Sequence, residues 1–150
     1  MRAVLQRVKK ATVKADGQIT ANIALGLLVL LGIEDEDTQD DIEWLCGKIA
    51  RLRIFDDENG IMNLSLQEVN GDAIVVSQFT LHASTKKGNR PSYVKAAKPE
   101  IAKPLYGKLV KHLSEEMGKS VGTGIFGAYM EVSLVNDGPV TIIIDTKQRF

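Results

Sequence analysis

The residues best suited to act on a carbonyl group follow one short apolar segment. Hydroxyl and amide side chains surround an aromatic ring in the run Ser77, Gln78, Phe79, Thr80. Backbone N–H groups and Oγ atoms at the end of a strand could hold a carbonyl oxygen, which is what acyl transfer requires. The alternative is an edge strand whose hydroxyl groups only satisfy neighbouring backbone, and by themselves these four residues favour that alternative.

A second segment combines turn-forming residues with a Gly-Pro dipeptide. The run Asn136-Asp137-Gly138-Pro139-Val140-Thr141, taken alone, predicts a hairpin turn between two strands. Its unusual feature is a proline that directly follows glycine and opens a strand. Because only about 5–6% of X-Pro bonds in folded proteins are cis, a cis bond here would imply a specific use.

Imidazole and thiol groups are scarce in this chain. The two histidines, His82 and His112, and the single Cys46 are too widely separated for a recognisable metal site. A nucleophilic triad would need one of the histidines. We expect structural roles instead, with His82 on the face of Thr80 if that strand continues and His112 on a helix surface. No metal or cofactor is predicted, and one cysteine indicates a reducing compartment.

Three glycines near the C-terminus have the spacing of a nucleotide-binding motif. Residues Gly122 to Gly127 match G-x-G-x-x-G, the dinucleotide-binding pattern. That pattern requires a strand before it and a helix after it. The residues that follow, 129–135, alternate as a strand does, and too little chain remains for the nucleotide-binding fold. We therefore interpret these glycines as sites of tight turns or close approach.

The composition is that of one ordinary soluble domain. The 150 residues are 44% hydrophobic and 25% charged, and 19 basic side chains balance 19 acidic ones. The longest apolar run, 23–33, is far shorter than the roughly 20 residues of a membrane helix. We expect a single domain, 1–150, in the cytoplasm, with no membrane contact.

Charge is nevertheless uneven along the chain. Residues 34–58 carry a net charge of −7, and residues 84–120 carry a net charge of +6. A basic segment can present a cationic face to phosphate groups even in a neutral protein. The alternative is a solvated helix surface, which composition alone favours.

The pattern of apolar residues predicts an α+β fold. A largely antiparallel, barrel-like sheet is expected, with two main helices packed on it. Thr38 and Asp41 predict a capping box at the first helix, and Gly118 predicts the end of the second. The predicted strands are 3–9, 12–15, 18–24, 27–33, 73–80, 129–135 and 140–145, and the predicted helices are 38–52 and 99–117.

Taken together, these segments closely resemble the D-aminoacyl-tRNA deacylase family over almost the whole chain. Any one matching segment is weak, but two signature motifs at the separation typical of the family, with their flanks, are highly specific. The matching residues are Gln6-Arg7-Val8, Gly26 to Gly32, Leu52-Arg53-Ile54-Phe55, Met62-Asn63, Ser77-Gln78-Phe79-Thr80-Leu81, Gly88 to Ser92, Phe126-Gly127-Ala128 with Met130, and Asn136 to Thr141.

The resemblance implies a homodimeric esterase that removes D-amino acids from tRNA. It implies a cis Gly138-Pro139 bond that reaches into the partner's pocket, where its carbonyl groups bind the substrate's α-amino group and L-substrates are rejected. Arg7 would brace this motif, and Met130 would complete the substrate-binding residues. Glycyl-tRNA should also be hydrolysed, because glycine has no side chain to exclude.

The same resemblance gives Ser77, Gln78, Phe79 and Thr80 catalytic positions. The N–H groups near Phe79 and Thr80 would form the oxyanion hole, and water would attack with help from the ribose 2′-hydroxyl. Lys86, Lys87 and Arg90 become candidates for tRNA binding. Two alternatives stay open, namely a non-catalytic RNA-binding module and a relative with a trans Gly-Pro bond and relaxed selectivity.

Overall fold

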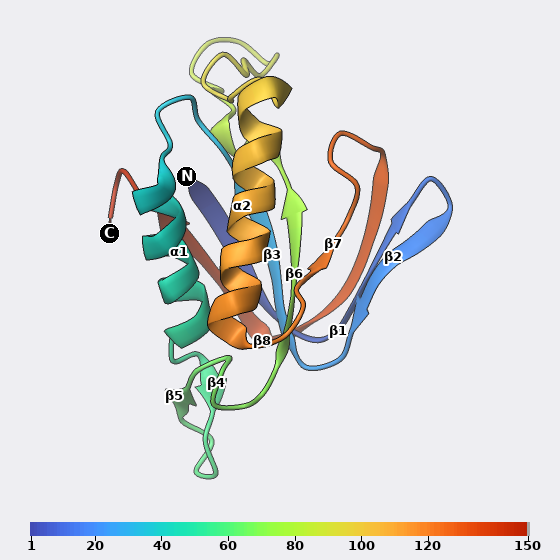
Figure 1. Ribbon diagram of the computed structural model, residues 1–150, viewed down its shortest axis with the longest axis vertical. Coiled ribbons are helices and arrows are strands. Elements are labelled where there is room, and N and C mark those ends of the chain that lie inside the picture. The colour runs from blue at the N-terminus through green and yellow to red at the C-terminus, as the bar shows by residue number, and fades with distance from the viewer. Residues whose placement is uncertain (150) are drawn as a thin grey trace.

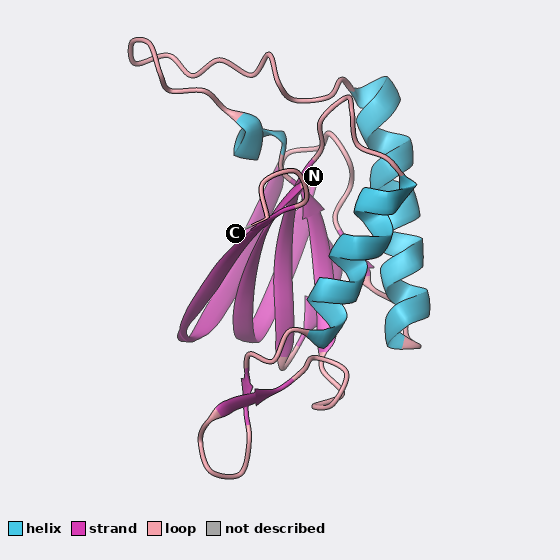
Figure 2. Ribbon diagram, turned by 90° about the vertical axis from the view of Figure 1, so that its left-hand side faces the viewer, coloured by secondary structure: helices cyan, strands magenta, loops and turns pink. Residues whose placement is uncertain are grey.

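A long, curled sheet carries two helices side by side on one of its faces (Figures 1 and 2). The computed structural model describes residues 1–149. Strand β1 (Arg2–Ala15) is the centre of the sheet. One edge of β1 pairs antiparallel with β8 (Met130–Asp145), and its other edge pairs antiparallel first with β3 (Gly26–Gly32) and then with β2 (Gln18–Ile23).

Beyond β3 the sheet continues with parallel pairs. Strand β6 (Asp72–Ser77) runs parallel to β3, and the two-residue strand β7 (Gly122–Thr123) runs parallel to β6. Parallel neighbours need a crossover connection, and the helices supply it. Helix α1 (Gln39–Arg51) lies in the connection from β3 to β6, and α2 (Pro99–Met117) lies in that from β6 to β7. The sheet is therefore mixed, with antiparallel pairs on both edges of β1 and parallel pairs beyond β3.

Apolar residues fill both sides of the central strands. The side chains of Leu5, Val29 and Val75 face the helices in a large core that includes Leu45 of α1 and Leu109 of α2. A smaller core on the concave side contains alternate residues of the same strands, among them Val8, Leu28 and Ile74. Burial on both faces explains why 27–31 is continuously apolar.

The ends of both helices agree with the sequence. The predicted capping box of α1 is present, because the Thr38 N–H donates to Asp41 Oδ2 at 2.8 Å. Helix α2 spans the predicted residues and ends at Gly118, whose φ of 68° is left-handed. A small hairpin of β4 (Phe55–Asp56) and β5 (Met62–Leu64) follows α1. No helix in the described part of the chain is long and apolar enough to cross a membrane.

The strands expected over 3–9 and 12–15 are one continuous strand, β1. Two further predictions of local structure are wrong, and both concern the candidate site. The strand expected over 73–80 ends at Ser77, and a 3-10 helix, η1 (Phe79–His82), follows it. His82 therefore does not share a strand face with Thr80. The two strands expected over 129–135 and 140–145 are not a hairpin. They are successive parts of β8 that pair with the same edge of β1.

The residues between the two parts of β8 leave the ladder. Gln6 pairs with Thr141 and Val8 pairs with Asn136, so two steps along β1 correspond to five along β8. The extra residues, which include Gly138 and Pro139, form an exposed bulge. Local turn signals predicted a reversal, but backbone pairing with the same edge of β1 on both sides of the bulge keeps both flanks in one direction.

Candidate active site

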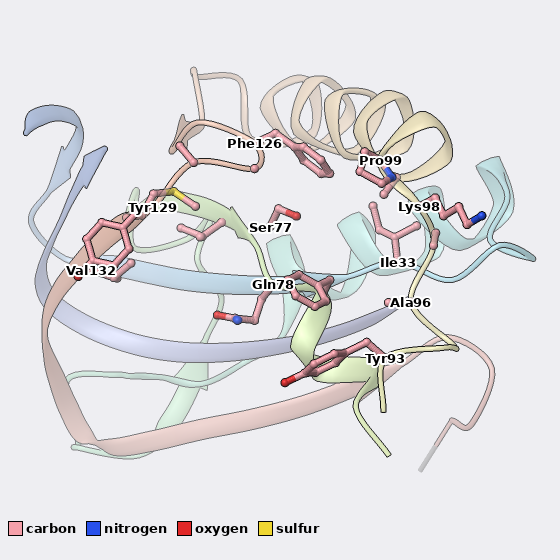
Figure 3. Close-up of a pocket in the computed structure, with 17 residues that line it drawn as sticks. Ile33, Ser77, Gln78, Tyr93, Ala96, Lys98, Pro99, Phe126, Tyr129 and Val132 are labelled. Carbon is pink, nitrogen blue, oxygen red and sulfur yellow. The ribbon is translucent and has the colours of Figure 1, made fainter. Parts of the chain in front are cut away.

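A cavity of about 610 Å³ lies where β6 ends and α2 begins (Figure 3). Ser77 and Gln78 enter it from the end of β6, and Lys98 and Pro99 form its rim at the start of α2. The loop after β7 supplies an aromatic wall. The remaining lining residues are Ile33, Val76, Phe79, Tyr93, Ala96, Ala97, Ala102, Phe126, Gly127, Ala128, Tyr129, Met130 and Val132.

Gln78 links the sheet to the 3-10 helix. Its N–H donates to the Leu31 carbonyl of β3 at 2.7 Å, which continues the ladder by one residue. Its side-chain Nε2 donates to Thr80 Oγ1 at 2.6 Å. Thr80 itself does not line the cavity, and its hydroxyl is already occupied by the Gln78 amide. This geometry makes Gln78 and Thr80 a mutually oriented pair.

The first N–H groups of η1 are available to a ligand. A helix leaves its first donors without intrahelical acceptors, and here those donors belong to Phe79 and Thr80. Neither donates to an acceptor within residues 1–149. Phe79 lines the cavity and Thr80 follows it directly. Two adjacent backbone donors at the edge of a cavity are an arrangement that can stabilise an oxyanion.

Aromatic rings form the upper wall and the mouth of the cavity. Phe79 and Tyr93 contact each other edge-to-face with ring centroids 5.1 Å apart, and both are partly exposed. Phe126 packs on Tyr106 at 5.8 Å. The Tyr106 hydroxyl donates to the Val75 carbonyl at 2.6 Å, and burial raises its pKa to about 12. Tyr106 therefore supports the wall and does not act as a base.

The glycine-rich segment 122–127 forms another part of this wall. It contains β7 and a turn, and the strand β8 follows it where the nucleotide-binding pattern would require a helix. A Cβ on Gly124 would overlap the sulfur atom of Met130. The sequence predicted that another backbone would lie close to these glycines, but at Gly124 the close neighbour is the Met130 side chain. The missing Cβ leaves room for Met130 to line the cavity.

Gly138 and Pro139 lie away from the cavity of their own chain. The Gly138-Pro139 bond is cis, and neither residue lines the cavity. Arg7, beside this bulge, pairs with Leu27 of β3, whereas Gln78 is bonded to Leu31. Four residues of β3 separate the two places, roughly 13 Å of extended chain. One chain therefore does not bring its two signature motifs together.

Arg7 holds the start of the bulge. Its guanidinium group is buried and donates to the carbonyl oxygens of Asp137 at 2.9 Å and Ile54 at 2.7 Å, with the Asp56 carboxylate at 3.3 Å. The carbonyl group bound is that of Asp137, one residue before Gly138. Arg7 thus connects the bulge to the segment after α1.

The candidate tRNA-binding residues lie on an extended loop between η1 and α2 (Figure 2). Lys86, Lys87 and Arg90 are exposed near its tip, beyond the bridge between Ser84 and Ser92. None of the three lines the cavity.

Sequence reasoning missed several cavity residues. Tyr93 and Lys98 lie on the returning part of the same loop, and Phe126, Ala128 and Tyr129 lie after β7. The sequence did contain a signal for two of them, because the aromatic Tyr93 and the cation Lys98 precede Pro99, which starts α2. No cluster of three or more metal-binding side chains occurs among residues 1–149.

A cavity bounded by paired backbone donors, an amide and hydroxyl groups is the kind of site that ester hydrolases use. The family described as D-Tyr-tRNA(Tyr) deacylase matches residues 4–145. The chain therefore belongs to this deacylase family and is an enzyme of the hydrolase class, as the sequence motifs indicated.

Similar proteins are found along the full chain. Proteins named D-aminoacyl-tRNA deacylase from Flavobacterium johnsoniae and Christiangramia forsetii are 65% and 64% identical, each over 99% of both chains. A solved structure described as "c-Myc DNA Unwinding Element Binding Protein" is 40% identical, with a TM-score of 0.91 over 97% of this chain and 99% of its own. Another, described as a probable eukaryotic D-amino acid tRNA deacylase, is 17% identical over 95% of this chain and 97% of its own. Its TM-score of 0.83 shows the same fold.

Proposed function

We propose that this chain, acting as one domain over residues 1–150, hydrolyses the ester bond of D-aminoacyl-tRNA and releases the free D-amino acid and tRNA. The observation that carries the proposal is the pair of N–H groups at the start of η1, on Phe79, which lines the cavity, and on Thr80, neither of which has an acceptor among the described residues. Membership of the deacylase family supports it. The reaction belongs in the cytoplasm, where charged tRNA is used.

The proposed chemistry needs orientation more than a strong nucleophile. A water molecule attacks the ester carbon, the bond to the ribose 3′-oxygen breaks, and that oxygen takes up a proton. The N–H groups of Phe79 and Thr80 bind the developing oxyanion, and the 2′-hydroxyl of the terminal ribose assists the water. Ser77 and the pair Gln78–Thr80 orient the ester beside these donors.

Selection for D-amino acids is proposed to come from a second copy of the chain. Gly138 and Pro139 are exposed on the bulge of β8, and they lie too far from their own cavity to serve it. In a homodimer, this bulge would enter the partner's cavity, where its carbonyl oxygens accept hydrogen bonds from the substrate's α-amino group. Because Gly138 has no Cβ, the backbone can approach the substrate closely and exclude a side chain of L configuration.

Two consequences follow for the substrates. Glycyl-tRNA has no side chain to exclude, so it is hydrolysed as well. The tRNA approaches past the loop 84–98, and its phosphate groups meet Lys86, Lys87 and Arg90 at the exposed tip. Met130 packs inside the cavity and contacts the aminoacyl group.

A non-catalytic nucleic-acid-binding role is the second candidate. It is favoured by one observation, the 40% identity to a structure described as a DNA-element-binding protein. That role predicts salt-dependent binding of tRNA without turnover.

A time course with purified protein tests the proposal. D- and L-aminoacyl-tRNA, charged with the same amino acid, are incubated with the wild-type chain and with Gly138→Ala. A Cβ at position 138 would lie 2.7 Å from the Val140 side chain and 2.8 Å from its backbone nitrogen, at a φ of +146° that favours glycine. We expect the wild type to hydrolyse only the D-ester, and the variant to lose roughly 100-fold in kcat/KM.

The matched control is Gly17→Ala. Gly17 also has a positive φ, of 77°, but lies in the β1–β2 turn with no heavy atom within 4 Å of a Cβ. Its activity should stay within about twofold of wild type. If D-aminoacyl-tRNA decays no faster with wild-type protein than in buffer while tRNA is bound, the second candidate replaces the proposal.

A further inference from the structure

The C-terminal end of η1 is held by polar contacts outside the cavity. His82 is the last residue of η1 and is 3% exposed. Its Nδ1 lies 3.2 Å from Glu34 Oε1. Arg2 donates from its guanidinium group to the Leu81 carbonyl at 2.9 Å. Neither Glu34 nor Arg2 lines the cavity.

The two ring nitrogens of His82 have different surroundings. Nδ1 faces the Glu34 carboxylate at 3.2 Å, and a carboxylate only accepts hydrogen bonds. The other ring nitrogen, Nε2, is buried and has no partner among the described residues. Glu34 is therefore the polar group that the structure places against this ring.

Gly32 makes room for the ring of His82. A Cβ at position 32 would lie 2.9 Å from Cδ2 of His82 and 3.0 Å from Cβ of Leu81. Both distances are shorter than ordinary contacts, so the end of β3 can be covered closely by η1 only because residue 32 is glycine. Shape and hydrogen bonding thus fix the same end of η1.

Arg2 is itself held by Asp145, the last residue of β8. Its Nε donates to Asp145 Oδ2 at 2.9 Å, and Asp145 also accepts from the N–H groups of Lys147 and Gln148. Burial would raise the pKa of Asp145, but these hydrogen bonds outweigh it and hold the pKa below its usual value. Asp145 therefore stays ionised, and Arg2 has a fixed partner.

The two ends of η1 are held by different contacts. At its start, Gln78 bonds to Leu31 and Thr80, and Phe79 packs on Tyr93, but the N–H groups of Phe79 and Thr80 donate to no acceptor among the described residues. A single helical turn directs its leading N–H groups along its axis. The direction of these donors therefore depends also on how firmly residues 81 and 82, at the other end, are held.

We propose that His82, Glu34 and Arg2 are positioning residues for the deacylase reaction, which act by fixing η1 so that the N–H groups of Phe79 and Thr80 point at the ester oxygen. This inference rests on the proposed function of those N–H groups. It assigns no contact with the substrate to any of the three side chains.

Paired substitutions test this role. His82→Ala and Glu34→Ala each break the pair, whereas His82→Asn keeps a donor in the place of Nδ1 and Glu34→Gln keeps an acceptor. Arg2→Ala frees the Leu81 carbonyl. We expect the three alanine variants to lower kcat by roughly tenfold with KM within twofold, and both conservative variants to recover most of the loss.

His112→Ala is the matched control. His112 also lies beside a glutamate, with Nε2 3.7 Å from Glu116, but on the outer part of α2 away from η1. Its kcat should equal that of the wild type. Unchanged kcat in His82→Ala and Glu34→Ala, or equal losses in the alanine and conservative variants, would overturn the proposal.

Hydrogen exchange of the backbone amides separates this inference from the proposed function. Loss of the contacts of His82, Glu34 and Arg2 should speed exchange at the N–H groups of Leu81 and Ala83, which donate to the carbonyl oxygens of Gln78 and Thr80. Exchange in α1 and α2 should not change. If the wild type proves inactive, the proposed function fails, and the exchange result still decides whether these side chains fix η1. Unchanged exchange in all three alanine variants would refute the proposal that these side chains fix η1.

Discussion

The sequence suggests Thr80 as a nucleophile, but the groups around its hydroxyl in the structure do not activate it. Its hydroxyl accepts a hydrogen bond from the Gln78 amide, which cannot remove a proton. The nearest histidine in sequence, His82, is buried, with its Nδ1 3.2 Å from Glu34 Oε1. A hydroxyl group without a base is a weak nucleophile. At the scale of single residues, the structure therefore favours a positioning role for Thr80.

Thr80→Ala should accordingly remain active. We expect a loss of roughly tenfold in kcat, because the backbone N–H of residue 80 is kept while the bond to Gln78 is lost. Thr80→Ser should behave as the wild type. Single-turnover hydrolysis of D-aminoacyl-tRNA measures both, and mass spectrometry checks for an acyl-enzyme. Complete loss in the alanine variant, with an acyl group on wild-type Thr80, would establish covalent catalysis.

At the scale of single elements, the start of α1 combines a helix cap with a contact to a distant segment. At the start of α1, the Asp41 carboxylate accepts from the Thr38 N–H at 2.8 Å and from Lys147 Nζ at 2.9 Å. Burial would raise the pKa of Asp41, but hydrogen bonds from Thr146, Lys147 and Thr38 hold it well below its usual value of 3.8. The cap of the helix is thus also the anchor of the C-terminal segment.

This shift predicts an acid-dependent loss of stability. Because the pKa of Asp41 is lower in the folded chain, its carboxylate stabilises the fold above about pH 4, and this stabilisation is lost as the pH falls below that value. Asp41→Asn should lower the free energy of unfolding by about 1–2 kcal/mol at pH 7 and flatten its decline between about pH 5 and pH 2. Urea unfolding at several pH values measures this. The exposed neighbour Asp40, changed to Asn, should keep the wild-type slope.

Two glycines of α2 should respond in opposite directions to alanine. Gly118 ends the helix at a φ of 68°, whereas Gly107 lies inside it with no heavy atom within 4 Å of a Cβ. We expect Gly118→Ala to cost about 1 kcal/mol and Gly107→Ala to gain about 0.5–1 kcal/mol. Chemical denaturation of the two variants measures both values. Changes of the same sign would contradict the assignment of the helix end.

At the scale of the whole molecule, the two motifs are separated by the sheet. The cavity lies at one end of β3 and β6, and the bulge with Gly138 lies near the other end of β3. A catalytic cavity and an exposed Gly-Pro bulge at different places can serve one reaction only if two copies exchange them. This arrangement is the reason for proposing a homodimer.

Mixed dimers test the exchange. Gly138→Ala spoils the bulge, and Ala128→Trp fills the cavity that Ala128 lines. Each variant alone should be inactive, but a mixed dimer has one site with an intact cavity and an intact bulge. Refolding equal amounts together should restore about a quarter of the wild-type activity, since half of the dimers are mixed. No recovery above the sum of the separate variants would mean that each chain uses its own bulge.

Sequence alone determined the features that depend on neighbouring residues. The Thr38–Asp41 cap, the end of α2 at Gly118 and the turn between the strands predicted over 12–15 and 18–24 are local events, and each lies where it was predicted. The motifs also identified the deacylase family. Local pattern was enough because each of these features is made by side chains and backbone within a few residues.

Tertiary structure decided what depends on distant partners. Backbone pairing with one edge of β1 joined the two predicted hairpin strands into one bulged β8, and the chain leaves β6 after Ser77 to form η1, where His82 packs against Gly32. Local propensities could not predict either outcome, since both depend on residues more than 40 positions away. The same packing placed Ser77 and Gln78 in a cavity with Tyr93 and Phe126, because a cavity is formed by elements that meet only after the chain has folded.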